Sequence, residues 1–322
     1  MTITNDAMKA MTPALACIAL TLCATLTHAR EGEPAVSVID DKALKAEFEE
    51  KMAALVKAGG STPYATLKEQ LERKSCKLEL PATGSETLPP AKIYQQRLNS
   101  TLMLGRLHHC SSKKCKKTHA SIASGVVIRE DGIVLTNHHV VAGGNERTLG
   151  IGAMTHDGKA FLVEEILAAD EKSDVAILKL ADAKDLSAAP VFRDEPVGNP
   201  VTIISNPTGR FFTLTQGYVS RYHVNSKGAP MMNVTADYAK GSSGGPIFNS
   251  RGDVVGLVAN TVSIPYRHVP LHVDEESDSL KIAGKGKKTH MHAGKPLTIG
   301  TNHQMTFKNS VPSRAILNLI ER

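Results

Sequence analysis

The sequence predicts an all-β fold for residues 93–322, with a helical extension before it and a short helix at its end. From about residue 93, short runs of β-branched and apolar residues alternate with turns rich in Gly, Asn and Asp. Two of these turns, at 130–133 and 250–253, contain Asp and Gly in positions that suit β-hairpins. Few helical patterns intervene, which favours a barrel or sandwich over a parallel α/β sheet.

Nine strands are expected in this region from the alternation of apolar runs and turns. They are residues 124–128, 133–136, 148–154, 176–180, 200–204, 214–221, 231–235, 246–248 and 254–259. After the last of them, residues 311–320 suit a terminal helix because Ala315, Ile316, Leu319 and Ile320 recur at helical spacing.

Residues 1–29 resemble an export signal. Lys9 gives a positive start, Met11–Leu26 is mostly apolar, and Thr27-His28-Ala29 ends the segment with small residues where a signal peptidase reads. An uncleaved anchor and a lipoprotein site at Cys17 are the alternatives. We expect an exported protein, periplasmic or secreted, with no stable membrane association once the signal is removed.

Residues 30–92 are expected to form a helical hairpin and a linker. The first helix, at 40–58, is capped by Asp40 or Asp41 and ends at Gly59-Gly60. The second begins with Ser61 or Thr62 as its cap and Pro63 in its first turn. The segment 78–90, rich in Pro, Thr and Ser, is interpreted as a linker. Both helices carry apolar residues on one face, which must dock on the rest of the chain or on a second copy: Leu44, Phe48, Met52, Leu55, Leu67 and Leu71.

The composition is that of an ordinary globular protein, with 41% hydrophobic and 22% charged residues among 322. The formal net charge of +6 is assigned to solubility, because no nucleic-acid-binding motif accompanies it. The sequence therefore predicts no nucleic-acid partner and no cofactor, and it leaves a homo-oligomer open.

Three short segments carry a candidate catalytic site: residues 136–141, 173–178 and 241–246. Ser243 needs a base to remove its proton, which His139 can supply, and Asp174 can orient that imidazole. His138 is the competing neighbour of His139. The glycines around Ser243 allow a tight turn in which the N–H groups of Gly241 and Ser243 point at a developing oxyanion.

These segments, in the order His, Asp, Ser, resemble the trypsin-like serine peptidases of the chymotrypsin fold, in particular the bacterial HtrA/Deg-like branch. Residues 124–128, 205–209 and 216–220 add to the resemblance, which extends from about Ile93 to Val262 and returns at 305–320. It implies two perpendicular six-stranded β-barrels, at about 93–190 and 191–322, with the catalytic triad in the cleft between them.

The sequence departs from that family in three places. Ser242 stands where the family commonly has Asn or Asp, and no PDZ-like domain is expected because few residues follow the protease domain. Residues 263–300 form an insertion rich in Lys and His, which is interpreted as a solvated loop although a metal site is the alternative. Its histidines are His268, His272, His290 and His292.

The resemblance implies a serine endopeptidase acting on proteins or peptides through an acyl-enzyme on Ser243. A catalytically silent homologue that binds peptides is the alternative, although no triad member is missing. An α/β-hydrolase is disfavoured, because its Gly-x-Ser-x-Gly elbow leads into a helix and its His comes last, whereas here Pro246 leads into a strand.

The specificity pocket is less clear from the sequence. By the resemblance, Asp237 would lie at the base of the pocket and select Lys or Arg, while Thr261 would narrow the entrance. A preference for small aliphatic residues, with Asp237 in a surface turn, is the alternative. The expected pocket residues are Asp237, Val258, Ala259, Asn260 and Thr261.

Three cysteines follow the signal segment: Cys76, Cys110 and Cys115. In an oxidising compartment Cys110 and Cys115 are expected to form a disulfide around a four-residue loop. Free thiols and a zinc site are the alternatives. Three neighbouring histidines could supply zinc ligands, but the spacing matches no common zinc finger and lysines crowd the loop. They are His108, His109 and His119.

Overall fold

The computed structural model describes residues 38–110, 115, 117–265, 271–274, 279–282, 291–292, 295–296 and 303–321. For those residues within 265–303, only the backbone is described; for the others, the side chains are described as well. Within this part of the chain, no helix has the length and apolar character that crossing a membrane requires.

The first barrel is a closed sheet of six antiparallel strands in the order β2-β3-β4-β7-β6-β5. β2 pairs with β3 along the whole length of β2, from Thr101 opposite Val126 to His109 opposite Thr118. The strands are β2 (Thr101–His109), β3 (Thr118–Arg129), β4 (Ile133–Thr136), β5 (Thr148–Thr155), β6 (Ala160–Asp170) and β7 (Val175–Leu180). Among the described residues of this barrel, the short α4 (His138–Ala142), after β4, is the only helix between strands.

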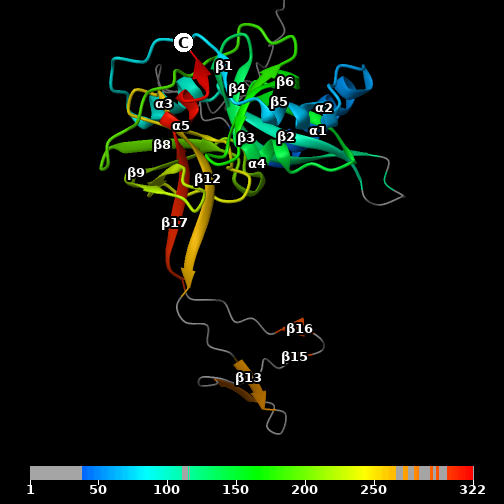
Figure 1. Cartoon of the computed structure of the whole chain (residues 1–322). Helices are drawn as coiled ribbons and strands as arrows, with labels where there is room; N and C mark the ends of the chain where they lie inside the picture. Colours follow the sequence, from blue (N-terminus) through cyan, green and yellow to red (C-terminus); the bar gives the residue numbers. More distant parts are fainter. Residues whose placement is uncertain are drawn as a thin grey trace, which may run out of the picture. The chain divides into compact units, whose positions relative to one another are not determined.

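The second barrel is also closed and has the order β10-β17-β12-β11-β8-β9. Its strands are β8 (Pro200–Ser205), β9 (Thr213–Val224), β10 (Pro230–Val234), β11 (Pro246–Phe248), β12 (Val254–Pro265) and β17 (His303–Pro312). The 3-10 turn η2 (Pro207–Gly209) joins β8 to β9. β17, red in Figure 1, lies antiparallel beside the gold β12 and closes the barrel.

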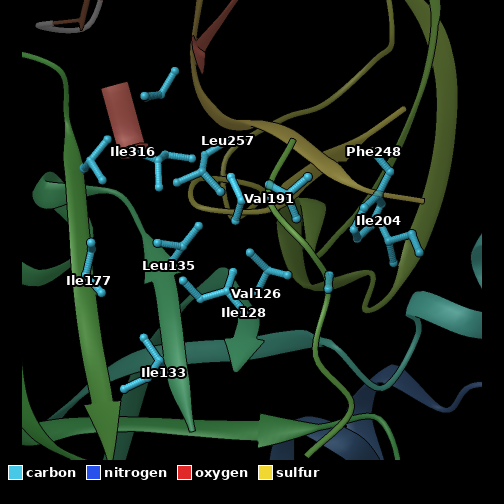
Figure 2. Packing of buried hydrophobic residues seen from close by; sticks show 14 of the residues in the cluster. Val126, Ile128, Ile133, Leu135, Ile177, Val191, Ile204, Phe248, Leu257 and Ile316 are labelled. Carbon is cyan, nitrogen blue, oxygen red and sulfur yellow. The ribbon is translucent and has the colours of Figure 1, made fainter. Parts of the chain in front are cut away.

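Successive side chains of a strand point to opposite faces of the sheet, so the apolar residues of each barrel fall into separate clusters. One face of the first barrel contributes Leu104, Val134 and Leu178 to a cluster drawn from all six strands, which only the barrel interior can bring together. A second cluster, including Ile203 and Ile247, belongs to the second barrel. The largest cluster combines residues of both barrels with the C-terminal helix, and Figure 2 shows part of it. Its labelled members include Leu135, Ile177, Phe248, Leu257 and Ile316. These residues lie on the outer faces of the barrels, and their burial against one another holds the two barrels together.

The helix expected at 40–58 is α1 (Asp41–Lys57), and the Asp40 carboxylate caps it by accepting the Ala43 N–H at 2.9 Å. Phe48 and Met52 are fully buried in the cluster shared with the barrels. The second helix is α2 (Tyr64–Glu69), continued by the 3-10 turn η1 (Gln70–Glu72). Its N-cap is Pro63, so the predicted caps were wrong, and the Thr62 hydroxyl instead donates to the Glu164 carbonyl at 2.7 Å. The helical extension therefore packs on the first barrel of its own chain.

The segment 78–90 is not the free linker that its composition suggested. Leu78 is buried, and the backbone N–H groups of Gly84 and Leu88 donate to Asp253 Oδ1 and the Ser250 carbonyl. A helix that the sequence did not predict, α3 (Pro90–Arg97), follows it. The chain closes with α5 (Ser313–Leu317) and β18 (Ile320–Glu321), which pairs in parallel with β1 (Cys76–Lys77). The terminal helix is thus shorter than expected.

The prediction of an all-β, two-barrel fold is confirmed, and all nine expected strands are present. Three barrel strands were missed: β2, β6 and β17. β2 contains two histidines and an arginine, and β6 contains Glu164 and Glu165, so neither shows a clean apolar alternation. Both are strands because their neighbours on each side complete the barrel.

Two regions singled out in the sequence fall wholly or partly outside the described residues. The export signal at 1–29 lies outside them, as do His268 and His290 of the insertion. For His272, in β13 (Leu271–Asp274), and His292, in β15 (Met291–His292), only the backbone is described. The short strands β14 (Ser279–Ile282) and β16 (Lys295–Pro296) pair with β13 and β15.

Phe48→Ala should destabilise the protein because it opens a cavity where α1 packs on the barrel. The side chain is fully buried, so we expect a loss of about 3–5 kcal/mol in the free energy of unfolding. Denaturant unfolding followed by circular dichroism measures it. Glu50→Ala, on the exposed face of the same helix, is the control and should change stability by less than about 0.5 kcal/mol. Equal stability of both variants would contradict the docking.

Candidate active site

His139 lies in the first turn of α4, directly after β4. Asn137 precedes the helix in an extended conformation, and Val140 and Val141 anchor the turn in the core. The His139 side chain remains half exposed. This local fold follows from the sequence, because the two valines must be buried and thereby leave the preceding histidine at the surface.

Asp174 lies in the turn between β6 and β7, with a positive φ of 59° that Asp tolerates better than most residues. Its carbonyl accepts the Asn137 side-chain N–H at 2.9 Å. Its carboxylate contacts His139 twice: Oδ2 lies 2.8 Å from Nδ1, and Oδ1 accepts the His139 backbone N–H at 2.9 Å. Asp174 therefore fixes both the position of the turn and the orientation of the imidazole.

Ser243 lies on a loop between β10 and β11 whose backbone needs two positive φ angles, at Gly241 (98°) and Gly244 (79°). The N–H groups of Ser242, Gly244 and Gly245 donate to carbonyl oxygens. Among the described residues, those of Gly241 and Ser243 donate to none. The loop thus presents the two predicted oxyanion donors without an acceptor in the part of the chain that the structure describes. The Ser243 hydroxyl donates to the Ala259 carbonyl at 3.2 Å and makes no hydrogen bond to His139 in this conformation.

Ser124 on β3 and Asn206 after β8 hold the Ser243 loop against the first barrel. The Ser124 N–H donates to the Ser243 carbonyl, and its hydroxyl donates to the Gly241 carbonyl, both at 2.9 Å. The buried Asn206 side chain donates to the carbonyls of Leu102 and Ala123. These contacts tie the loop of one barrel to β2 and β3 of the other.

A cavity of about 470 Å³ opens beside Ser243 and His139. The structure brings three of the five expected pocket residues to its wall: Ala259, Asn260 and Thr261. Tyr238, Ala239 and Lys240 complete the lining. The Tyr238 hydroxyl donates to the Asn309 carbonyl at 2.5 Å, and burial raises the pKa of its phenol. The wall is therefore neutral around Tyr238.

Asp237 and Val258 do not line this cavity. The Asp237 side chain is 87% exposed and pairs with Lys308 Nζ at 3.0 Å. Val258 is buried behind the Ser243 loop. Its carbonyl accepts the Gly244 N–H, and its N–H donates to the Gly245 carbonyl. The expectation of a carboxylate at the base of the pocket is therefore wrong for this structure. The residue next in sequence, Tyr238, points inward in its place.

A larger groove of about 570 Å³ adjoins the first cavity and runs between the two barrels. His138 and His139 both line it, together with residues of the turn between β9 and β10, including Asn225 and Lys227. Burial lowers the pKa of His138, although the nearby carboxylates of Asp174 and Glu171 oppose that shift. His138 has no contact with Ser243, whereas His139 lines both cavities.

The predicted disulfide between Cys110 and Cys115 is absent, and both residues are half-buried thiols in the structure. Cys76 is half-buried in β1. Burial raises the pKa of its thiol, and the nearby Glu321 adds to that shift.

The sequence did not identify Ser124, Asn206 or Tyr238, nor Arg106, which donates to the His139 carbonyl at 3.2 Å. Ser124 and Asn206 did occur inside segments that carried the family resemblance, at 124–128 and 205–209. Their roles were invisible because each acts across the interface between the barrels. Tyr238 was missed because the sequence pointed to its neighbour, Asp237, whose carboxylate could have bound a basic substrate side chain.

Comparison with known proteins agrees with this architecture. The trypsin-like peptidase domain family matches residues 123–257. A probable periplasmic serine endoprotease, DegP-like, from Hahella chejuensis is 37% identical over 142 residues, which are 42% of this chain and 29% of that protein. A protein of the same description from Pseudomonas fluorescens is 35% identical over 142 residues, with the same coverage. The match thus spans less than a third of the length of these relatives.

The solved structure of the HtrA-type protease AlgW with a decapeptide superimposes with a TM-score of 0.51 at 18% identity, covering 72% of this chain and 69% of that chain. At this identity the likeness concerns the fold. Fold, segment order and relatives lead to the same conclusion. Residues 123–257 match the trypsin-like peptidase domain family, the relatives that match this part of the chain are described as DegP-like serine endoproteases, and the likeness to the HtrA-type structure is one of fold.

Proposed function

We propose that this chain is an exported serine endopeptidase that cleaves peptide bonds through an acyl-enzyme on Ser243. The observation that carries the proposal is that His139, whose Nδ1 lies 2.8 Å from the Asp174 carboxylate, lines the same cavity as Ser243. The serine protease description of the DegP-like relatives and the decapeptide in the AlgW structure support it. The substrates we propose are proteins or peptides.

The chemistry follows from this arrangement in two half-reactions. The Ser243 hydroxyl turns from the Ala259 carbonyl to His139 Nε2, gives up its proton and attacks the substrate carbonyl carbon. The free N–H groups of Gly241 and Ser243 stabilise the resulting oxyanion, and Asp174 stabilises the imidazolium. His139 then protonates the leaving amine. In the second half-reaction a water molecule, activated by the same imidazole, hydrolyses the acyl-enzyme and restores the hydroxyl.

The alternative is a peptide-binding homologue that does not cut. One observation favours it: the Ser243 hydroxyl bonds to the Ala259 carbonyl instead of the imidazole. Hydrogen bonds in uncomplexed active sites are often long or poorly aligned, so this geometry alone does not exclude catalysis. The measurement of activity described next distinguishes the two functions.

Ser243→Ala should abolish peptide cleavage, lowering kcat by about a million-fold, because no other group can form the acyl-enzyme. Asp174→Asn should lower kcat by about ten-thousand-fold, since it favours the wrong tautomer of His139. Turnover of a fluorogenic peptide and of casein by the purified full chain measures both. His139→Ala should equal the serine variant, and the double variant should lose little more.

His138→Ala is the matched control for the triad. It neighbours His139 and lines the same groove, yet it has no contact with Ser243 or bond to Asp174, so the chemical step should be retained. Cleavage by folded Ser243→Ala protein at the parental rate would refute the triad. Absence of cleavage by the parent, with peptide binding retained, would support the silent homologue.

Tyr64 is proposed to position His139 from outside the site. Its buried hydroxyl donates to the Val141 carbonyl at 2.7 Å and accepts the Gly144 N–H at 2.8 Å, which fastens both ends of the turn after His139. Tyr64→Phe should therefore lower kcat several-fold and cost about 1–3 kcal/mol of stability.

Tyr94→Phe is the control for this positioning role. It also removes one tyrosine hydrogen bond, to the Phe212 carbonyl at 3.1 Å, but that bond does not contact α4. It should lower stability and leave kcat unchanged. A parallel loss of kcat in both variants would show that stability alone, and not the position of His139, governs activity.

The cavity beside Ser243 suits an uncharged side chain of small or medium size. Lys308, only 15% exposed, lies with its ammonium 5.4 Å from the Tyr238 ring and donates to the Tyr238 carbonyl at 3.3 Å. A substrate Lys or Arg would meet this cation behind the cavity wall, while the carboxylate of Asp237 is already paired and turned to solvent.

A mixed peptide library should therefore be cut after Val or Ala in preference to Lys or Arg, by at least about tenfold in kcat/KM. Asp237→Asn should leave that preference unchanged. A preference for basic residues that disappears in Asp237→Asn would restore the sequence-based expectation and refute the neutral pocket.

We also propose a periplasmic or secreted location. The apolar segment before Ala29 supports it, as does the periplasmic description of the DegP-like relatives, which match over part of their length.

A further inference from the structure

We propose that Cys110, Cys115 and His119 bind a zinc ion at the tip of the β2–β3 hairpin. The site is separate from the cavities beside Ser243 and uses none of the residues assigned to catalysis. Its ligand atoms, two thiol sulfurs and one imidazole nitrogen, all lie within 4.8 Å of one another. Thiolate and imidazole are the ligands that zinc prefers in proteins.

The hairpin itself brings these ligands together. β2 ends at His109 and β3 begins at Thr118, and the two residues are paired. Cys110 and Cys115 therefore lie just beyond the last pair, while His119 lies one residue inside it. Cys115 Sγ is 3.3 Å from His119 Nε2. With metal–ligand distances of about 2.3 Å for sulfur and 2.0–2.1 Å for nitrogen, ligands of one tetrahedral zinc lie roughly 3.6 Å apart. Small side-chain adjustments suffice.

The second nitrogen of His119 faces a carboxylate. Nδ1 lies 3.9 Å from Glu49 Oε1 on α1, and the same oxygen accepts the Ala120 N–H at 3.2 Å. The Glu49 side chain is only 23% exposed. This 3.9 Å distance is longer than a hydrogen bond, so the His119 ring must shift towards Glu49 to form the carboxylate–histidine contact that fixes the tautomer and raises ligand basicity at zinc sites.

This arrangement favours a metal over the disulfide that the sequence suggested. A disulfide would account for two sulfurs close together, but it would give no role to the His119 Nε2 that lies 3.3 Å from Cys115 Sγ. Two thiolates would neutralise the charge of Zn²⁺. The three protein ligands leave a fourth position for water or for His108, whose ring centroid is 6.3 Å from that of His119.

Zinc bound here would connect the hairpin to α1 through Glu49. The extension would then be fastened to the first barrel by its buried apolar face and by an outer-shell contact to the metal. Zinc should therefore raise the melting temperature of the protein, because it binds the folded hairpin and not the unfolded chain.

The test is a zinc titration of the full chain, purified without oxygen and with its thiols reduced, in competition with a chromophoric chelator. We expect one tightly bound ion per chain and a higher melting temperature. Cobalt in place of zinc should give thiolate-to-metal charge-transfer absorption and the intense visible bands of a tetrahedral site. Glu49→Gln should weaken zinc binding by about 10–100-fold.

Cys115→Ser and His119→Ala should each weaken zinc binding more than Glu49→Gln does. Two matched controls lie outside the cluster: Cys76→Ser, a half-buried cysteine on β1, and His109→Ala, the exposed neighbour of Cys110. Both should bind zinc as the parent does. Circular dichroism of the metal-free variants checks that each is folded.

Three results would overturn the proposal. They are the absence of a cobalt–thiolate band in the reduced protein, zinc binding that survives in both Cys115→Ser and His119→Ala, and a Cys110–Cys115 disulfide that forms at once in zinc-loaded protein exposed to a glutathione redox buffer. Mass measurement after thiol alkylation detects the last of these.

Discussion

A small set of hydrogen bonds between the two barrels is the constraint on which the rest of the site depends. Asn206, fully enclosed after β8, donates to two carbonyls of the first barrel and accepts the Phe212 N–H with its own oxygen. Ser124 holds the Ser243 loop by donating hydrogen bonds to the carbonyls of Gly241 and Ser243. A buried polar group without a hydrogen-bond partner destabilises the fold, so a network in which every group is paired favours a single arrangement of the barrels. The barrels are thereby joined in one register, with the Ser243 loop and α4 on opposite walls of one cleft.

This constraint also brings together the three proposed catalytic residues, which come from separate parts of the chain. His139 and Asp174 belong to the first barrel: His139 follows β4, and Asp174 directly precedes β7. Ser243 belongs to the second barrel. Apolar burial brings the barrels together, but it is non-directional and cannot set the relative position of three side chains to within an ångström. The directional bonds do so. Gly244 illustrates the tightness of the fit, because any Cβ there would collide with the Ser124 carbonyl and with Thr136.

The N-terminal helices extend the same principle to the outer side of the first barrel. Their apolar faces supply the energy of docking, through fully buried Phe48, Met52 and Leu67. Their polar groups then act at particular points: Tyr64 contacts the turn after His139, and Glu49 faces His119. A segment that resembles an appendage in the sequence is thus in contact with both the candidate active site and the proposed zinc site.

The sequence by itself predicted the fold class, a helix at 40–58 that the structure places at 41–57, and most strands, and it pointed to His139, Asp174 and Ser243 as candidate catalytic residues. These depend on local patterns: apolar alternation, glycine turns, and nucleophile, base and carboxylate in a familiar order. The tertiary structure alone decided the rest. β2 and β6 are strands because their neighbours complete a barrel, and Asp237 lies outside the pocket because Lys308, 71 positions away along the chain, pairs with it. Likewise, the spacing of Cys110 and Cys115 suggested a disulfide, whereas pairing of β2 with β3 brings His119 close to both thiols. Contacts between residues far apart in the chain leave no periodicity to read, so only the folded arrangement reveals them.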